Sequence, residues 1–362
     1  ENSVKEIKEN AESNENKNEK ENKKDKDKSI EKEKDRKIKN IINESIIDQN
    51  HLSSENPIRF NKISFFSRLH MGIGLGILKL IPNGTFLEKY KVVNFLPRLI
   101  GNEAYTRIWR KLLAAKFGSL MKEVNMAWFW SRVAKRTKNL GYFDGGFRTL
   151  AEKMADYIKK KGGVFHLNSK IDIKSAKFDG FDKVIITTPG PIADEIVGKK
   201  VMPKIEYLWA QTLVLELKRS LIKSYWLNIL EEKWPFLVAV EHTRMINKKH
   251  YNGKTIVYLG NYFEPNNSQL SLDKSEVTKL YIKYLKELNP NFKKEWIVSS
   301  HLFRAPYAQP VFPVNYSEHL KNVPREKGKF LFANMSMVYP FDRGTNYAVK
   351  QGVDIARYLL KK

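Results

Sequence analysis

The sequence predicts an α/β (α+β) protein in two parts, one built like a nucleotide-binding domain and one from a mixed sheet with covering helices. Three observations support this fold class. Between residues 145 and 187, a helix-like run is followed by two short apolar runs that are typical of strands. Residues 328–360 give the order strand, loop, helix, and residues 202–300 contain three β-rich runs and one charged helical run.

Composition sets the limits on function. The 362 residues suffice for two domains, and a hydrophobic content of 42% suffices for a substantial core. Lys+Arg 65 against Asp+Glu 40 gives a net charge of +25, which attracts phosphates, anionic lipids and acidic ligands. The absence of cysteine excludes disulfides, thiolate metal sites and a cysteine nucleophile. The seven histidines have no metal-ligand spacing, so no metal is expected.

The first part of the chain has the composition of a disordered segment. Residues 14–39 contain no aromatic and almost no aliphatic residue, so they cannot bury enough apolar surface to offset the entropy lost on ordering. We therefore expect residues 1–55 to be a disordered charged segment. The chain opens with Glu1 instead of methionine, so we expect that an upstream segment is missing, although an error in the gene model would look the same.

Helical patterns dominate the next stretch. The run 64–80 is apolar with basic punctuation, and Gly72, Gly74 and Gly76 are spaced like a glycine-rich nucleotide loop. No β-branched strand precedes these glycines, so an amphipathic helix, buried or lying at a membrane surface, is the preferred interpretation. In residues 95–136, apolar and aromatic side chains recur at helical spacing. No run approaches the roughly 20 apolar residues of a membrane span. We expect a cytoplasmic protein, with peripheral membrane contact left open.

The unit from 145 to 187 has clear boundaries. A glycine pair at 145–146 precedes the helical run 147–161, and a second pair at 162–163 ends it. Strands are predicted at 164–167 and 183–187. This order is typical of an α/β nucleotide-binding domain.

The last unit contains the best candidate site. A strand at 330–333 leads through a polar loop to a helix that is predicted from about Tyr347. A helix N-terminus presents unpaired backbone N–H groups and a positive dipole end, which stabilise a phosphate or an electron-rich ring edge. Gly344 allows close backbone approach, while Thr345 and Asn346 are small polar residues of the capping type.

Three sequence blocks, at 140–147, 182–189 and 331–356, together resemble the flavin-containing amine oxidase superfamily. That superfamily includes monoamine oxidases, protoporphyrinogen oxidase and phytoene desaturases. The segment 109–130, with its Lys-Phe-Gly at 116–118, is similar to the helical region of the desaturase-like and protoporphyrinogen-oxidase-like branch.

The resemblance implies an FAD-binding Rossmann-like domain and a substrate domain of mixed sheet and helices. The FAD-binding domain is expected to be incomplete, because no G-x-G-x-x-G turn is present to hold the FAD pyrophosphate. The implied organisation, after the charged segment 1–55, is a helical part of the substrate domain (56–140), part of the FAD-binding domain (141–200), the substrate-domain sheet and helix (201–305), and the C-terminal strand and helix of the FAD-binding domain (306–362).

Site residues follow from the same resemblance. The strand after 162–163 should bring Ile171 to the adenine. The cofactor-binding residues implied are Ile171, Thr187, Thr188, Pro189, Asn334, Asp342, Arg343, Gly344, Thr345 and Asn346. The substrate-proximal residues implied are Tyr307, Gln309 and Pro310.

The function implied is that of an FAD-dependent oxidoreductase that transfers a hydride from a small-molecule substrate to the flavin. No catalytic residue is assigned, because the acidic residues form no recognisable acid–base pair. Two alternatives stay open. One is a non-catalytic basic binding protein that keeps the fold and contacts an anionic membrane or polymer, although no nucleic-acid-binding signature is present. The other is a relative of the flavin-dependent sugar-nucleotide mutases.

Overall fold

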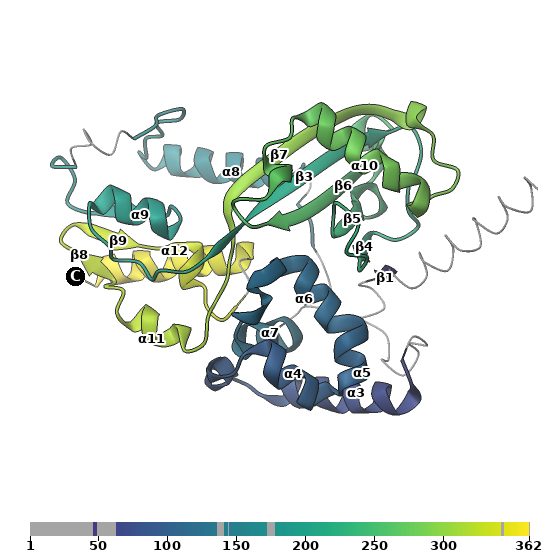
Figure 1. Cartoon of the computed structure of the whole chain (residues 1–362). Helices are drawn as coiled ribbons and strands as arrows, with labels where there is room; N and C mark the ends of the chain where they lie inside the picture. The colour runs from purple at the N-terminus through teal and green to yellow at the C-terminus, as the bar shows by residue number, and fades with distance from the viewer. Residues whose placement is uncertain are drawn as a thin grey trace, which may run out of the picture.

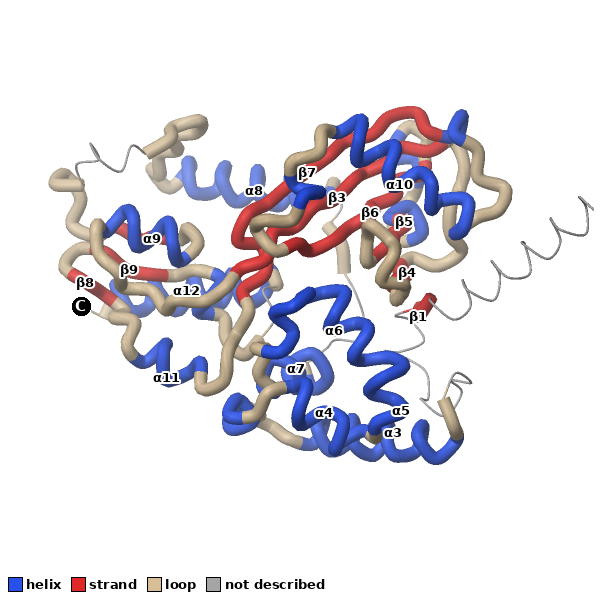
Figure 2. The backbone as a smooth tube through the Cα atoms, in the orientation of Figure 1, coloured by secondary structure: helices blue, strands red, loops and turns tan. Residues whose placement is uncertain are grey.

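The computed structural model describes residues 46–48, 63–135, 141–143, 145–171, 178–341 and 344–361. It has three parts: a six-stranded sheet, a layer of helices beside it, and a small three-stranded sheet flanked by helices (Figures 1 and 2). The predicted charged segment 1–55 lies outside the described residues, apart from the backbone of 46–48. The α/β (α+β) fold class is confirmed.

The six-stranded sheet is antiparallel throughout, with strand order β1-β4-β5-β6-β3-β7. Its longest strands are neighbours, so most of its hydrogen bonds join β3 to β6 and β7. Along the second half of β3, buried and partly buried residues alternate, as expected for a sheet covered more fully on one face. The strands are β1 (Ile46–Asp48), β3 (Tyr207–Leu217), β4 (Trp226–Ile229), β5 (Val238–Glu241), β6 (Thr255–Phe263) and β7 (Ile297–Pro310).

Helix α10 (Lys274–Leu288) covers one face of this sheet. It begins with a capping box, in which the Asp273 side chain accepts from the Glu276 amide and the Glu276 carboxylate accepts from the Asp273 amide. Its apolar residues lie four apart and are fully buried against the leucines of β3. These residues are Val277, Tyr281 and Leu285.

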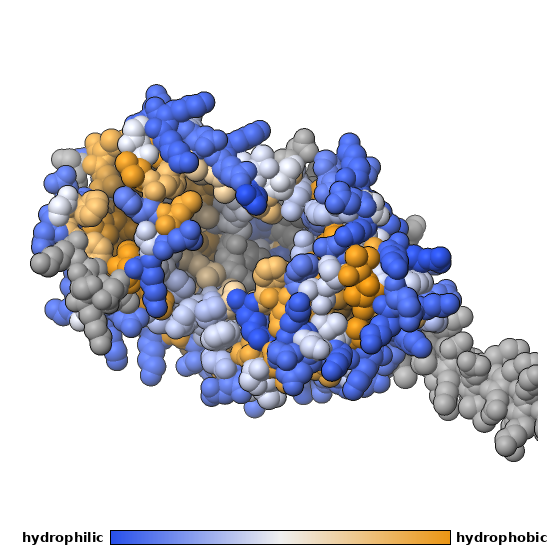
Figure 3. Space-filling view, turned by 90° about the horizontal axis from the view of Figure 1, so that it is seen from above, coloured by the Kyte–Doolittle hydropathy of each residue, from blue (hydrophilic) through white to orange (hydrophobic). Residues whose placement is uncertain are grey.

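The small sheet has the order β2-β9-β8, with β2 and β9 parallel. Among the described residues, its packed cluster of buried apolar side chains is small: Ile186, Ala193, Val201, Met202 and Phe332. Seen from above, hydrophobic side chains gather at the end of the molecule that carries α8 and α9 (Figure 3). The elements of this part are α8 (Gly146–Lys160), β2 (Val184–Ile186), α9 (Gly190–Val197), α11 (Tyr316–Lys321), β8 (Glu326–Lys327), β9 (Phe330–Phe332), η9 (Met335–Met337) and α12 (Thr345–Leu360).

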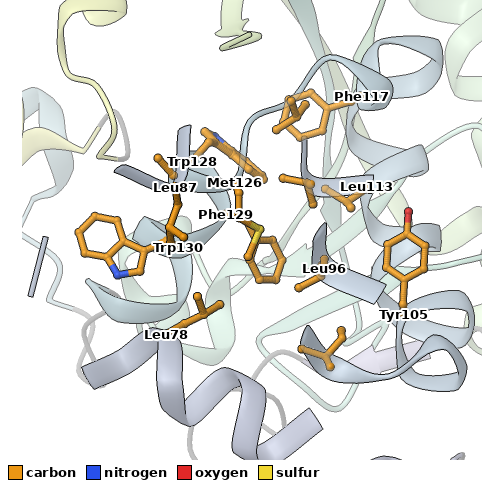
Figure 4. Packing of buried hydrophobic residues seen from close by; sticks show 14 of the residues in the cluster. Leu78, Leu87, Leu96, Tyr105, Leu113, Phe117, Met126, Trp128, Phe129 and Trp130 are labelled. Carbon is orange, nitrogen blue, oxygen red and sulfur yellow. The ribbon is translucent and has the colours of Figure 1, made fainter. Parts of the chain in front are cut away.

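The helical layer encloses its own core, in which Trp130, Phe129 and Leu96 pack together (Figure 4). Helices α3 and α4 contact through their backbones at Gly74, where an added Cβ would lie 2.3 Å from the Leu99 carbonyl oxygen. Only glycine fits there without a shift of one helix. The elements are α3 (Phe65–Leu80), η2 (Thr85–Lys89), α4 (Val92–Ile100), α5 (Asn102–Ala104), η3 (Tyr105–Trp109), α6 (Arg110–Phe117), η4 (Gly118–Lys122) and α7 (Met126–Ala134).

One predicted strand is wrong. Residues 164–167 form irregular chain and a turn after α8, and the side chains of Val164 and Leu167 are each 78% exposed. An apolar run forms a strand only beside another strand, and none pairs with it among the described residues.

The strand β7 was not predicted, and it runs through residue 305, where a domain boundary was expected. Its half-buried Arg304 breaks the apolar alternation. Its guanidinium donates to Gln211 Oε1 at 2.7 Å and to two carbonyl oxygens before α10.

Candidate cofactor site at the end of the parallel strands

The strands β2 and β9 end together at one edge of the small sheet. Ile186 lies opposite Phe332, and the Ala333 amide donates to the Ile186 carbonyl oxygen at 3.1 Å. Thr187, Thr188 and Pro189 follow β2 directly. Asn334 follows β9 after one intervening residue, Ala333. The carboxyl edge of parallel strands is where α/β sheets hold their ligands.

Two buried polar groups at this edge have no partner among the residues that the structure describes. Asn334 is 3% exposed, and its Oδ1 accepts from the Ser336 amide (3.1 Å) and hydroxyl (2.7 Å). The Asn334 Nδ2, however, has no acceptor among the described residues. The Thr188 hydroxyl has no partner there either. Because an unsatisfied buried group costs about 1–3 kcal/mol, two of them at one sheet edge indicate a place built for a ligand.

The N-terminus of α12 lies at the same edge. Further along α12, Gln351 Nε2 donates to the Asn334 carbonyl oxygen at 3.1 Å. This hydrogen bond fixes α12 to the end of β9. Gly344 precedes the helix with φ −89° and ψ 160°, and no side chain in the described part of the chain caps the helix. The amides of Tyr347 and Ala348 donate to the Gly344 carbonyl oxygen at 3.0 and 3.1 Å.

The first two amides of α12, those of Thr345 and Asn346, have no acceptor within the described ranges. Asp342 and Arg343, two of the expected cofactor-binding residues, lie outside these ranges. Two available N–H groups, the positive end of a 16-residue helix, an amide donor and a hydroxyl fit an electron-rich or anionic group. The residues present therefore fit the polar edge of a flavin.

The end of β7 lies close to this edge and has an unusual backbone. Tyr307 has φ +56°, in the left-handed region that only glycine adopts freely. The pairing of β3 with β7 shifts register between Leu208 and Ala210, so a bulge is present opposite Trp209. Backbone strain of this kind costs about 1–3 kcal/mol and is found preferentially at functional sites. The buried Gln309 and Pro310 pair with Leu208 and Tyr207.

Tyr207, which the sequence did not single out, joins these groups. Its ring meets that of Tyr307 edge-on with centroids 5.4 Å apart. A Cβ added to Gly190, the residue after Pro189, would lie 3.2 Å from the Tyr207 hydroxyl. Burial raises the pKa of Tyr207, and hydrogen bonds to the Ser336 side chain and the Gly190 backbone oppose that rise. Tyr307 is thereby held beside the ends of both β2 and β9.

A buried carboxylate ties the helical layer to the same region. Glu88 accepts from the Tyr339 hydroxyl at 2.8 Å and from the Ser317 amide at 2.9 Å, and the Ser317 hydroxyl also donates to it. Burial, and then the Glu88 carboxylate, raise the pKa of Tyr339. This network fixes the loop after β9 against η2 and α11. No sequence motif marks Glu88 or Tyr339.

A second polar cluster lies on the face of the large sheet opposite α10. Val257 and Leu259 face the core under α10, so Tyr258 between them faces the other way. His242 is buried, its Nε2 is 2.8 Å from the Tyr251 hydroxyl, and its ring meets those of Tyr258 and, at 5.0 Å, Tyr142.

Burial controls the charge of this cluster. It lowers the pKa of His242 and, together with the neighbouring tyrosines, raises the pKa of Tyr258 to about 12. The cluster is therefore uncharged near neutral pH. Tyr142 precedes α8, so the cluster also places the start of α8 against the sheet. A scattered histidine and three separate tyrosines give no signal in the sequence.

A cavity of about 580 Å³ lies between α6 and the large sheet. This volume is in the range of small-molecule sites. Leu208, which follows Tyr207, contributes to its wall, which combines aromatic, aliphatic and polar side chains. Other lining residues are Phe117, Gly118, Trp234, Tyr262 and Glu264.

The remaining expected site residues lie apart from these groups or in the open. Ile171 is 53% exposed in irregular chain after α8, not in a strand as expected. Thr187 is exposed as well. Within the described ranges, no group of three or more potential ligands could hold a metal ion. In the same ranges, no helix has the length and apolarity needed to cross a bilayer.

No protein-family model and no curated protein matches the sequence. Solved structures match the fold. A protein assigned as a protoporphyrinogen oxidase from Exiguobacterium sp. 255-15 gives a TM-score of 0.61 at 12% identity, over 86% of this chain and 78% of that chain. Reduced UDP-galactopyranose mutase gives 0.59 at 13% identity, over 83% and 74%. An oxidoreductase from Methanosarcina mazei gives 0.53 at 14% identity, over 80% and 70%. The chain therefore shares the fold of these solved structures, in agreement with the resemblance that its three sequence blocks carry.

Proposed function

We propose that this chain is an FAD-dependent oxidoreductase whose cofactor binds at the carboxyl edge of β2 and β9. The observation that carries the proposal is the meeting, at one edge, of two buried polar groups and a helix N-terminus for which the described residues supply no partner and no cap. The shared fold with a protein assigned as an oxidase supports the same reading. Flavin, when bound, would supply the acceptor for a hydride from the substrate.

The chain's own residues would bind and orient both partners. The amides of Thr345 and Asn346 would donate to the electron-rich edge of the ring, and the positive end of α12 would favour added negative charge there. Asn334 Nδ2 and the Thr188 hydroxyl would bond other polar atoms of the cofactor. Tyr307, held by Tyr207, would limit the space on the substrate side.

The proposal is tested by deleting one backbone amide. Proline is tolerated at the first position of a helix, so Thr345→Pro removes one N–H group and leaves α12 intact. Gly344 already has the extended backbone that a following proline requires. One hydrogen bond to a charged group contributes about 1.5–3 kcal/mol, so FAD affinity should fall about 10-fold or more. FAD titration of the full chain, followed by flavin fluorescence, measures this.

The matched control is Lys274→Pro, at the first position of α10. There too the preceding residue is extended, and the helix is capped by its own side chains. This variant should bind FAD like the wild type. A wild-type chain that binds no FAD, or equal affinities for wild type and Thr345→Pro, would overturn the proposal.

The mutase alternative rests on one observation, the nearly equal structural similarity to reduced UDP-galactopyranose mutase. A sugar-nucleotide mutase would convert its substrate with reduced flavin and consume no net electrons. Incubation of the chemically reduced holoprotein with UDP-galactopyranose distinguishes the two. Isomer formation without flavin oxidation would favour the mutase over the oxidoreductase.

A further inference from the structure

Helix α3 is apolar on two opposite faces. One face, with Met71, Gly74 and Leu78, is buried in the core of the helical layer. The other face is exposed. Four of its apolar residues lie four apart in the sequence, and two more lie on the same side of the helix. The exposed residues are Phe65, Phe66, Leu69, Ile73, Ile77 and Leu80. A helix that is apolar all round normally has apolar surroundings on every side.

The exposed stripe is held rigidly in place. The hydroxyls of Ser64 and Ser67 both donate to Glu103 Oε2, and the Ser64 side chain also caps α3. At Gly74 the helix backbone contacts α4. Phe66 is 80% exposed even so. In Figures 1 and 2, α3 lies at the outer edge of the helical layer, on the side away from the sheets. The stripe is thus a fixed outer surface and not a frayed end.

The charge around this helix is one-sided. Residues 63–135 contain twelve lysines and arginines, three glutamates and no aspartate, a net charge of +9. Each of the three carboxylates is occupied within the protein. Glu88 is buried in the tyrosine network, Glu103 accepts from the two serines, and Glu123 pairs with Lys91 at 3.0 Å. The helical layer therefore presents an apolar stripe in a cationic setting.

We propose that α3 docks the protein on the surface of an anionic lipid bilayer, with its exposed stripe lying among the acyl chains. An interfacial helix binds through buried apolar area together with attraction of basic residues to anionic headgroups. A second copy of this chain is the other possible occupant, but it would bring another +9 against the first. This proposal does not depend on flavin binding.

Vesicle flotation of the full chain tests the proposal. Binding is expected to vesicles of phosphatidylcholine with 30% phosphatidylglycerol (roughly a typical anionic fraction) and not to phosphatidylcholine alone. High salt should weaken it. The double variant Phe66→Gln, Ile73→Gln should lower partitioning at least about 10-fold, since two apolar side chains lose favourable transfer. The control is Val164→Gln, Leu167→Gln, an equally exposed apolar pair after α8, which should bind like the wild type.

The absence of cysteine provides a direct probe of depth. The variants Ile73→Cys and Leu167→Cys each carry a single thiol, which can be labelled with an environment-sensitive fluorophore. Only the label at residue 73 should shift to the blue on addition of anionic vesicles. The cysteine variants and the glutamine variants are separate proteins. A folding defect in one set therefore leaves the other set informative.

Three outcomes would overturn the inference. The first is equal binding to neutral and anionic vesicles, and the second is a blue shift at residue 167 but not at 73. The third is a concentration-dependent dimer that the double variant Phe66→Gln, Ile73→Gln dissociates, which would show that a second copy covers the stripe.

Discussion

Helices α7 and α8 both carry large apolar side chains, but the surroundings of the two helices are opposite. Six consecutive residues of α7, from Met126 to Ser131, are buried. Helix α8 has no buried residue, and Phe147, Met154, Tyr157 and Ile158 on its apolar face are all exposed. Helix α12 resembles α8, since Ile355 is its only buried residue. The helical layer and the large sheet thus have closed cores, while the small sheet and its helices present apolar faces that nothing among the described residues covers.

The difference shows what hydrophobic periodicity does and does not determine. It predicts that a helix forms, because one stripe of side chains gains from leaving water. It does not say whether the stripe finds a partner. The candidate cofactor site lies in the part with the small core, and low local stability is common where proteins bind ligands.

Truncation of a large side chain should give the greatest contrast between the two parts. Trp130 is fully buried, and its indole N–H donates to the Ile81 carbonyl oxygen at 3.2 Å. Trp130→Ala should lower the free energy of unfolding by about 3–5 kcal/mol. Tyr157→Ala in α8, where the side chain is 65% exposed, should lower it by less than about 0.5 kcal/mol. Urea unfolding followed by circular dichroism measures both. A large loss for Tyr157→Ala would show that the face of α8 is covered in solution.

Local patterns in the sequence predicted most elements, and they singled out residues that lie at the ends of β2 and β9. The α12 helix, the strand at 184–186 and the charged helix α10 follow from local patterns of apolar, charged and glycine residues. What could not be predicted depends on contacts between distant segments. Tyr207 meets Ser336 and Gly190 because the end of β3, a strand of the large sheet, lies beside the small sheet. Glu88 meets Tyr339, which lies 251 residues later in the sequence. The irregular chain at 164–167 is the converse case, an apolar run without a strand to pair with.

Two glycines in helices give a smaller contrast of opposite sign. At Gly74 an added Cβ would lie 2.3 Å from the Leu99 carbonyl oxygen, so Gly74→Ala should destabilise the protein by about 1–3 kcal/mol. At Gly352 in α12 an added Cβ meets nothing within 4 Å. Gly352→Ala should therefore stabilise the helix by about 0.5–1 kcal/mol, since alanine loses less backbone entropy.

Thermal unfolding of the two glycine variants measures both effects without ligand. Repeating the Gly352→Ala measurement with FAD sharpens the comparison. If the substitution stabilises the free protein but weakens FAD binding, the open face of α12 receives the cofactor or a segment ordered by it. A destabilised Gly352→Ala protein without FAD would contradict the open face.

The smallest effect concerns proton uptake by His242. Burial lowers its pKa below the ordinary value of 6.5, and the rings of Tyr142, Tyr251 and Tyr258 face it. Below about pH 6.5 the unfolded chain therefore binds a proton at this position that the folded chain excludes. The stability that depends on a neutral His242 is fully present above that pH and is lost as the pH falls.

Urea unfolding between pH 7.5 and 5 tests the sign of this effect. His242→Gln should unfold with a shallower pH dependence than the wild type, because the titrating group is gone. His166→Gln replaces an exposed histidine after α8 and serves as the matched control for the loss of an imidazole. Equal slopes for wild type and His242→Gln would show that the imidazole exchanges protons freely in the folded state. The His242 cluster would then be open to solvent, like the apolar faces of α8 and α12. That face of the large sheet would no longer differ from the small sheet in its exposure to water.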